Sequence, residues 1–149
     1  MTQISRSALL PYSCQQVYAL INDVSAYPHY MNGCVGVEVY QHGVDELGQE
    51  FMEARLDLSK GGFRHSLTTR NKLFPPTKVE MKLVDGPVEN FTGLWELLPL
   101  SEDACKVSLS LGFSISSRML GAAARVMFEP LADDLVDSLV KRAHNLHQP

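Results

Sequence analysis

The apolar residues of this 149-residue chain change their spacing near residue 116, and that change limits the folds available to it. From Cys34 to Ile115, apolar and polar residues mostly alternate, which is typical of half-buried β-strands. After residue 116, apolar residues recur three or four positions apart, which is the spacing of one face of an α-helix. The sequence therefore predicts a sheet with one apolar face and a long terminal helix that covers it.

The predicted terminal helix extends from residue 116 to about residue 147. Its apolar face is formed by Leu120, Ala124, Met127, Leu131, Leu135, Leu139, Ala143 and Leu146. Pro130 interrupts the pattern, because proline lacks a backbone N–H and clashes with the carbonyl four residues earlier. Since the apolar spacing keeps its phase across Pro130, we expect a kink there and not two separate helices.

The rest of the chain predicts an α+β fold. Strands are expected at residues 3–10, 35–40, 52–58, 63–70, 78–83, 91–99 and 105–115. Ser13 and Gln16 have the spacing of a capping box and predict a helix at residues 13–24, followed by a short helical turn at residues 27–31. Short loops between consecutive strands indicate an antiparallel order. We therefore expect one domain, residues 1–149, in which a curved antiparallel sheet of about six or seven strands surrounds the long C-terminal helix.

A sheet that curls around one helix often leaves space that its own side chains do not fill, so we expect a cavity. Its predicted wall residues alternate along the strands or lie on the apolar helix face. They are Leu56, Leu67, Met81, Trp95, Leu109 and Leu111 on the sheet and Met127, Leu131 and Leu135 on the helix. Ordinary core packing explains the same pattern, including the position of Trp95.

Positive charge is concentrated in one part of a chain whose net charge is −4. Residues 55–82 hold seven lysines and arginines but two acidic residues, Asp57 and Glu80. The candidate surface residues are Arg55, Arg64, Arg70, Lys72, Lys78 and Lys82. They either form the solvated face of the sheet or contact an anionic partner, such as RNA or a membrane surface. The overall negative charge argues against DNA binding.

The sequence contains no pattern typical of an enzyme or a metal site. GxSxG, HExxH and phosphate-loop motifs are absent, and no pair of histidines at metal-ligand spacing is supported by carboxylates. His65 falls on the apolar face of its strand, where we expect a core or rim residue. The three cysteines, Cys14, Cys34 and Cys105, are widely spaced, so neither a disulfide framework nor a zinc site is expected. With no signal-peptide core and no apolar run long enough to span a membrane, we expect a cytoplasmic protein that is free or at the surface of the inner membrane.

Several passages of the chain resemble the coenzyme Q-binding and RatA (ribosome association toxin) branch of the START-like, polyketide cyclase/dehydrase superfamily. The passages are TQISRSALLPYS at the start, INDVSAYPHYMNGC at residues 21–34, TTRNKL at 68–73, LVDGP at 83–87 and GLWELLPLSEDAC at 93–105. Their order and spacing are more specific than any one of them, and the resemblance extends over nearly the whole chain. It implies the helix-grip fold, in which two small helices follow the first strand.

The resemblance also implies two functions, and a third hypothesis is considered beside them; none of the three requires a cofactor. The first is non-enzymatic binding of ubiquinone or a related polyprenyl lipid in the cavity, in support of respiration. The alternative is a toxin that binds the large ribosomal subunit and blocks its association with the small subunit. The third, an oligoketide cyclase, would require inward polar side chains, of which the sequence offers only His65 and Thr69. No catalytic residue is implied, and a bound hydrophobic molecule could coexist with a ribosomal partner.

Overall fold

The computed structural model describes residues 2–115 and 125–147, and it confirms the α+β fold. Seven strands form one antiparallel sheet in the order β1-β7-β6-β5-β4-β3-β2. The strands are β1 (Thr2–Leu10), β2 (Cys34–Val44), β3 (Glu50–Lys60), β4 (Phe63–Phe74), β5 (Lys78–Asp85), β6 (Glu89–Ser101) and β7 (Ala104–Ser114). The helices are α1 (Cys14–Asn22), the 3-10 helix η1 (Val24–His29) and α3 (Leu131–His147).

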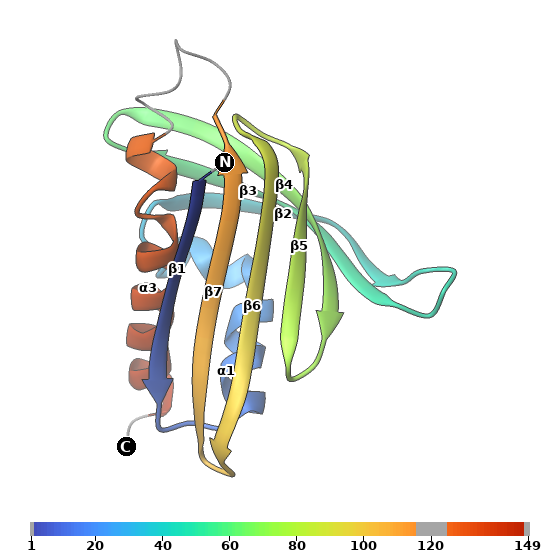
Figure 1. Ribbon diagram of the computed structural model, residues 1–149, viewed down its shortest axis with the longest axis vertical. Helices are drawn as coiled ribbons and strands as arrows, with labels where there is room; N and C mark the ends of the chain where they lie inside the picture. The colour runs from blue at the N-terminus through green and yellow to red at the C-terminus, as the bar shows by residue number, and fades with distance from the viewer. Residues whose placement is uncertain (1, 116–124, 148–149) are drawn as a thin grey trace.

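The sheet bends around its helices. Figure 1 shows α3 against the same side of β1 and β7 that faces α1, while β2, β3 and β4 cross behind them. Strand β1 pairs with β7 from Thr2 opposite Phe113 to Leu10 opposite Cys105, so the first strand lies beside the last. The concave face of the sheet is therefore covered by helices, and the convex face is open to solvent.

The predicted capping box starts helix α1. The Ser13 hydroxyl accepts a hydrogen bond from the Gln16 backbone N–H at 3.1 Å, and the Gln16 side chain accepts one from the Ser13 backbone N–H at 3.0 Å. Two backbone donors at the helix start are thereby satisfied. The helix ends at Asn22, two residues earlier than expected, because the chain tightens into η1 at Val24.

Pro130 separates two helical stretches, and the expected single kinked helix is wrong in this part of the chain. Residues 125–128 are helical, residues 129–130 form a turn, and α3 begins at Leu131. Proline is tolerated at the very start of a helix, where its missing N–H would have no partner anyway. The Pro130 carbonyl accepts from the Asp134 backbone N–H at 2.9 Å. Residues 116–124 of the expected helix lie outside the described residues.

Helix α3 provides the apolar cover with one face. Leu131, Leu135, Leu139 and Ala143 are buried as expected, but Leu146 is 50% exposed because it lies near the open end of the helix. The helix has 17 residues and is therefore about 25 Å long. It contacts β1, β7 and α1, which places it over one half of the sheet.

Replacement of Leu139 with alanine is expected to lower the free energy of unfolding by about 2–5 kcal/mol, because the side chain is 0% exposed and its loss leaves a void. Urea unfolding monitored by circular dichroism measures this difference. The same replacement at Leu146, on the same helix, is the control and should cost less than about 0.5 kcal/mol. Equal losses for the two variants would contradict the packing of α3 described above.

Candidate functional site

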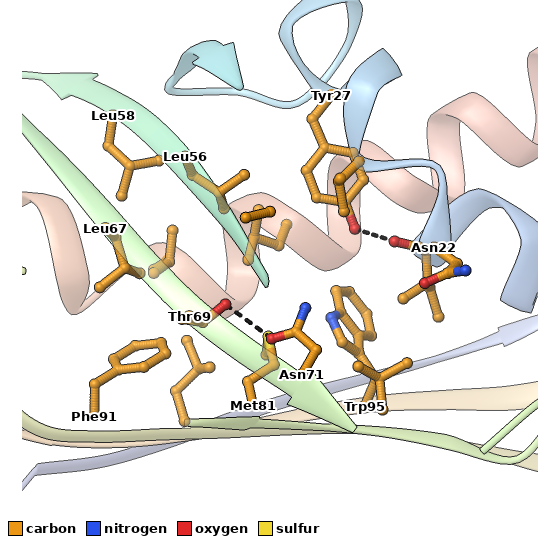
Figure 2. Close-up of a pocket in the computed structure, with 17 residues that line it drawn as sticks. Asn22, Tyr27, Leu56, Leu58, Leu67, Thr69, Asn71, Met81, Phe91 and Trp95 are labelled. Atoms are coloured by element: carbon orange, nitrogen blue, oxygen red, sulfur yellow. Dashed lines mark hydrogen bonds between the residues drawn. The ribbon is translucent and has the colours of Figure 1, made fainter. Parts of the chain in front are cut away.

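A cavity lies between the concave face of the sheet and the helices (Figure 2). Its volume is about 50 Å³, which is room for a few water molecules. The lining residues are Ile21, Asn22, Val24, Tyr27, Ala54, Leu56, Leu58, Leu67, Thr69, Asn71, Val79, Met81, Phe91, Trp95, Leu111, Leu131 and Leu135. The wall is therefore built mainly by apolar side chains and includes no acidic or basic residue.

Most of the predicted wall residues line this cavity. They are Leu56, Leu67, Met81, Trp95, Leu111, Leu131 and Leu135. Leu109 and Met127 do not line it; both are buried elsewhere in the core. The period-two pattern correctly identified the inward faces of β3 to β7, but it could not tell which inward residues border free space.

The polar part of the wall was predicted only in part, since Thr69 lies on the inward face as expected but Asn71 was not identified. Asn71 follows Leu67 and Thr69 at the same period-two spacing on β4. Since every second residue of a strand points to the same face, this spacing was enough to place Asn71 on the inward face. The Thr69 hydroxyl donates to Asn71 Oδ1 at 2.8 Å, and the two residues are 7% and 8% exposed. Figure 2 shows this pair beside Trp95.

Tyr27 fixes the position of η1 over the cavity. Its hydroxyl donates to the backbone carbonyl of Ile21, at the end of α1 (Figure 2). Burial raises the pKa of Tyr27 well above its usual value of 10.0, because an ionised phenolate would lose its hydration there. The cavity therefore has a second polar contact that is satisfied within the protein.

His65 does not reach the cavity, contrary to the expectation of an inward polar residue. It is exposed near the hairpin end of β4, and its Nδ1 accepts from the Ser66 backbone N–H at 3.0 Å. Its ring also stacks on Phe63, with the ring centroids 6.0 Å apart. These contacts hold the imidazole against its own strand.

Polar contacts attach the start of α3 to the rest of the cavity wall. Lys60, at the end of β3, pairs with Asp134, and the Asn32 side chain donates to the same carboxylate at 3.4 Å. The Asn32 backbone N–H also donates to the Ser138 hydroxyl at 3.0 Å. The first turns of α3, which carry Leu131 and Leu135, are thus held over the cavity from two sides.

The six basic candidates lie at the convex face, and acidic side chains neutralise some of them. Arg55 pairs with Asp57 at 3.0 Å and with Glu38 at 3.1 Å, and Lys78 pairs with Glu80 at 3.1 Å. A hydrogen bond from Ser66, together with Arg55, holds the pKa of Asp57 below its usual range.

Of the remaining four cations, Arg70, Lys72 and Lys82 form what we call the outer basic cluster. The Arg70 guanidinium lies over the Phe51 ring, 3.9 Å from its centroid, and 3.9 Å from Glu53. Lys72 and Lys82 are exposed and form no ion pair with any residue in the described ranges. A small pocket here also includes Asp45 and Glu80, so the charge of this surface is mixed. Arg64 lies apart from this cluster, in a hollow beside Asp57.

None of the helices in the described ranges is long and apolar enough to cross a membrane.

Replacement of Tyr27 with phenylalanine is expected to reduce the loss of stability at high pH. Above pH 10 the unfolded chain ionises this tyrosine while the folded chain keeps it protonated, so the free energy of unfolding falls as pH rises. Urea unfolding at neutral pH and at about pH 11 measures that fall. Replacement of the exposed Tyr40 with phenylalanine is the control. If the free energy of unfolding of the wild type and of Tyr27→Phe falls equally between neutral pH and high pH, the Tyr27 hydroxyl is not buried in the folded protein.

Comparison with known proteins supports the fold and the family. The chain is 40% identical over 147 residues to the ribosome association toxin RatA of Vibrio cholerae, which covers 99% of both proteins. It is 39% identical over 147 residues to the persistence and stress-resistance toxin PasT of Escherichia coli, covering 99% of this chain and 90% of that protein. The mitochondrial coenzyme Q-binding protein COQ10 of Drosophila melanogaster is more distant, at 22% identity over 97% of this chain and 60% of that protein.

Solved structures share the architecture at low identity. An aromatase/cyclase from a Streptomyces species, Zhui, superposes with a TM-score of 0.83 at 14% identity, covering 99% of this chain and 96% of that one. A START superfamily protein of Mycobacterium smegmatis has a TM-score of 0.78 at 17% identity, covering 97% and 98%. Both share the helix-grip fold with this chain. Residues 10–140 match the family described as polyketide cyclase / dehydrase and lipid transport, and the chain therefore belongs to that family.

Proposed function

We propose that this protein binds the large ribosomal subunit and blocks its association with the small subunit, without a catalytic step. The observation that carries the proposal is the 40% identity to the ribosome association toxin RatA over nearly the full length of both chains. Quinone binding, which the sequence analysis placed first, has weaker support, since the coenzyme Q-binding relative is 22% identical. The comparisons thus favour the ribosomal function over quinone binding.

The outer basic cluster is the surface best suited to ribosomal RNA. Arg70 and Lys82 lie directly opposite each other on β4 and β5. Like charges in such a pair repel each other, so a phosphate between them would relieve the repulsion. Arg70 is also positioned by its contact with Phe51. Because the chain as a whole is negative, contact with RNA would have to be local.

Reversal of two charges in this cluster, Lys72→Glu with Lys82→Glu, is expected to reduce co-sedimentation with large ribosomal subunits by at least about tenfold at moderate salt. Each lost phosphate contact removes a counterion-release contribution, so the salt dependence of the remaining binding should also become shallower. The matched control is Lys106→Glu with Lys141→Glu, which changes the net charge equally on exposed sites of β7 and α3.

Two outcomes would count against these claims. If the wild-type protein does not co-sediment with large subunits at any salt concentration, the ribosomal function is wrong. If Lys72→Glu with Lys82→Glu binds as well as the wild type, or if the control variant loses as much binding, the outer basic cluster is not the contact.

A second function is favoured by the cavity: binding of a hydrophobic molecule such as a polyprenyl quinone. Apolar walls without a charged residue suit such a ligand, and each Å² of buried apolar surface would contribute about 25 cal/mol. The cavity of about 50 Å³ is small beside the roughly 300–1,000 Å³ of typical ligand sites, so the ligand would have to widen it. Met81 can change shape readily, because its side chain is unbranched.

Ligand extraction tests this second function. Protein purified from a quinone-producing host is expected to release an isoprenoid that mass spectrometry detects, and Ala54→Leu should abolish it by filling the cavity with a larger side chain. Circular dichroism checks that the variant is folded. If the wild type carries no isoprenoid and takes up no quinone in a fluorescence titration, the cavity does not have this role.

A further inference from the structure

The cavity wall carries a hydrogen-bond donor that has no acceptor within the described residues. Asn71 is 8% exposed, and its Oδ1 accepts from the Thr69 hydroxyl. That bond leaves the amide nitrogen with two N–H groups, and neither donates to an acceptor in residues 2–115 or 125–147. Figure 2 shows this nitrogen directed into the free space.

Trp95 adds a second donor to the same part of the wall. Its indole lies beside Asn71 in Figure 2, and the indole N–H donates to no protein atom in the described part of the chain. The neighbouring hydroxyls are already used, since Thr69 donates to Asn71 and Tyr27 donates to Ile21. Asn22, the other polar residue of the wall, is only half-buried. This part of the cavity therefore offers N–H donors that have no protein acceptor, while the Thr69 and Tyr27 oxygens, whose hydrogens are already donated, can only accept.

The unused donors and the uncharged wall together restrict what can bind. An amide N–H at a cavity wall that has no protein acceptor is usually satisfied by water or by a ligand. An ionised carboxylate would also find donors here, but no lining residue carries a positive charge to balance it, and burial of an unpaired charge is strongly unfavourable. A neutral oxygen acceptor has no such penalty.

We propose that Asn71 is the specificity-determining residue of the cavity, selecting an uncharged ligand that presents a carbonyl or similar acceptor oxygen on an apolar body. Thr69 acts as a positioning residue, because its hydroxyl holds the amide with the nitrogen toward the cavity. Free fatty-acid anions are excluded. This inference rests on the proposal that the cavity takes up a hydrophobic molecule, and it adds the chemical class.

Three aromatic probes of similar size test it on the full chain: acetophenone carries a carbonyl, ethylbenzene has no acceptor, and benzoate is an anion. Binding is followed in ¹H–¹⁵N spectra through the Asn71 side-chain amide and the Trp95 indole N–H. We expect wild-type protein to bind acetophenone about fivefold more tightly than ethylbenzene, with a larger shift of the Asn71 amide, and to bind benzoate undetectably. In Asn71→Leu, acetophenone and ethylbenzene should bind equally. Asn22→Leu is the control and should keep the wild-type preference.

The outcomes distinguish a failure of the role of Asn71 from a failure of the proposal that the cavity binds a hydrophobic molecule. Equal binding of acetophenone and ethylbenzene by wild-type protein overturns the role of Asn71, as does a preference that survives in Asn71→Leu. Benzoate binding as tight as that of acetophenone overturns the exclusion of anions. If no probe binds, the cavity proposal fails together with this inference. If Asn71→Leu does not fold, the amide shifts and the affinities of the wild type still decide.

Discussion

Burial of the concave sheet face beneath α3 and α1 is the interaction on which the rest of this structure depends. An antiparallel sheet with one apolar face is not stable alone in water, and a single helix of 17 residues covers much of it. Because a helix is narrow and the sheet is broad, the cover is incomplete in the middle. The cavity follows from that mismatch, since the inward side chains of β3 to β6 extend from a curved surface toward a straight rod.

The same constraint separates the two proposed roles in space. Most inward residues of each strand are apolar because they pack against the helices, and outward residues are free to carry charge. On β4, Leu67 and Asn71 face the cavity, whereas Arg70 and Lys72 face solvent. A molecule in the cavity and a partner on the convex face would therefore contact the same strand without competing for a side chain.

Local pattern was enough to predict some features and not others. The period-two runs identified the strands and five cavity-lining residues, and the helical spacing identified two more, Leu131 and Leu135. The Ser13–Gln16 spacing identified the start of α1. All of these depend on neighbours in sequence. The partial neutralisation of the basic segment could not be predicted, because Glu38 reaches Arg55 only through the β2–β3 register. Asn71 was missed because it is polar and follows the predicted strand at residues 63–70, so the alternation of apolar and polar residues ended before it.

The pairing of β1 with β7 has a consequence for how the chain folds. These strands are joined by hydrogen bonds although nearly the whole sequence separates them, so the sheet cannot be completed until β7 has been synthesised. Contacts so distant in sequence bear a large loop-closure cost and make folding slow. Until then β1 and the edge strand β6 lack the partner that lies between them, and the apolar face of the sheet is not yet covered by α3. The nascent chain therefore depends on its surroundings to avoid aggregation.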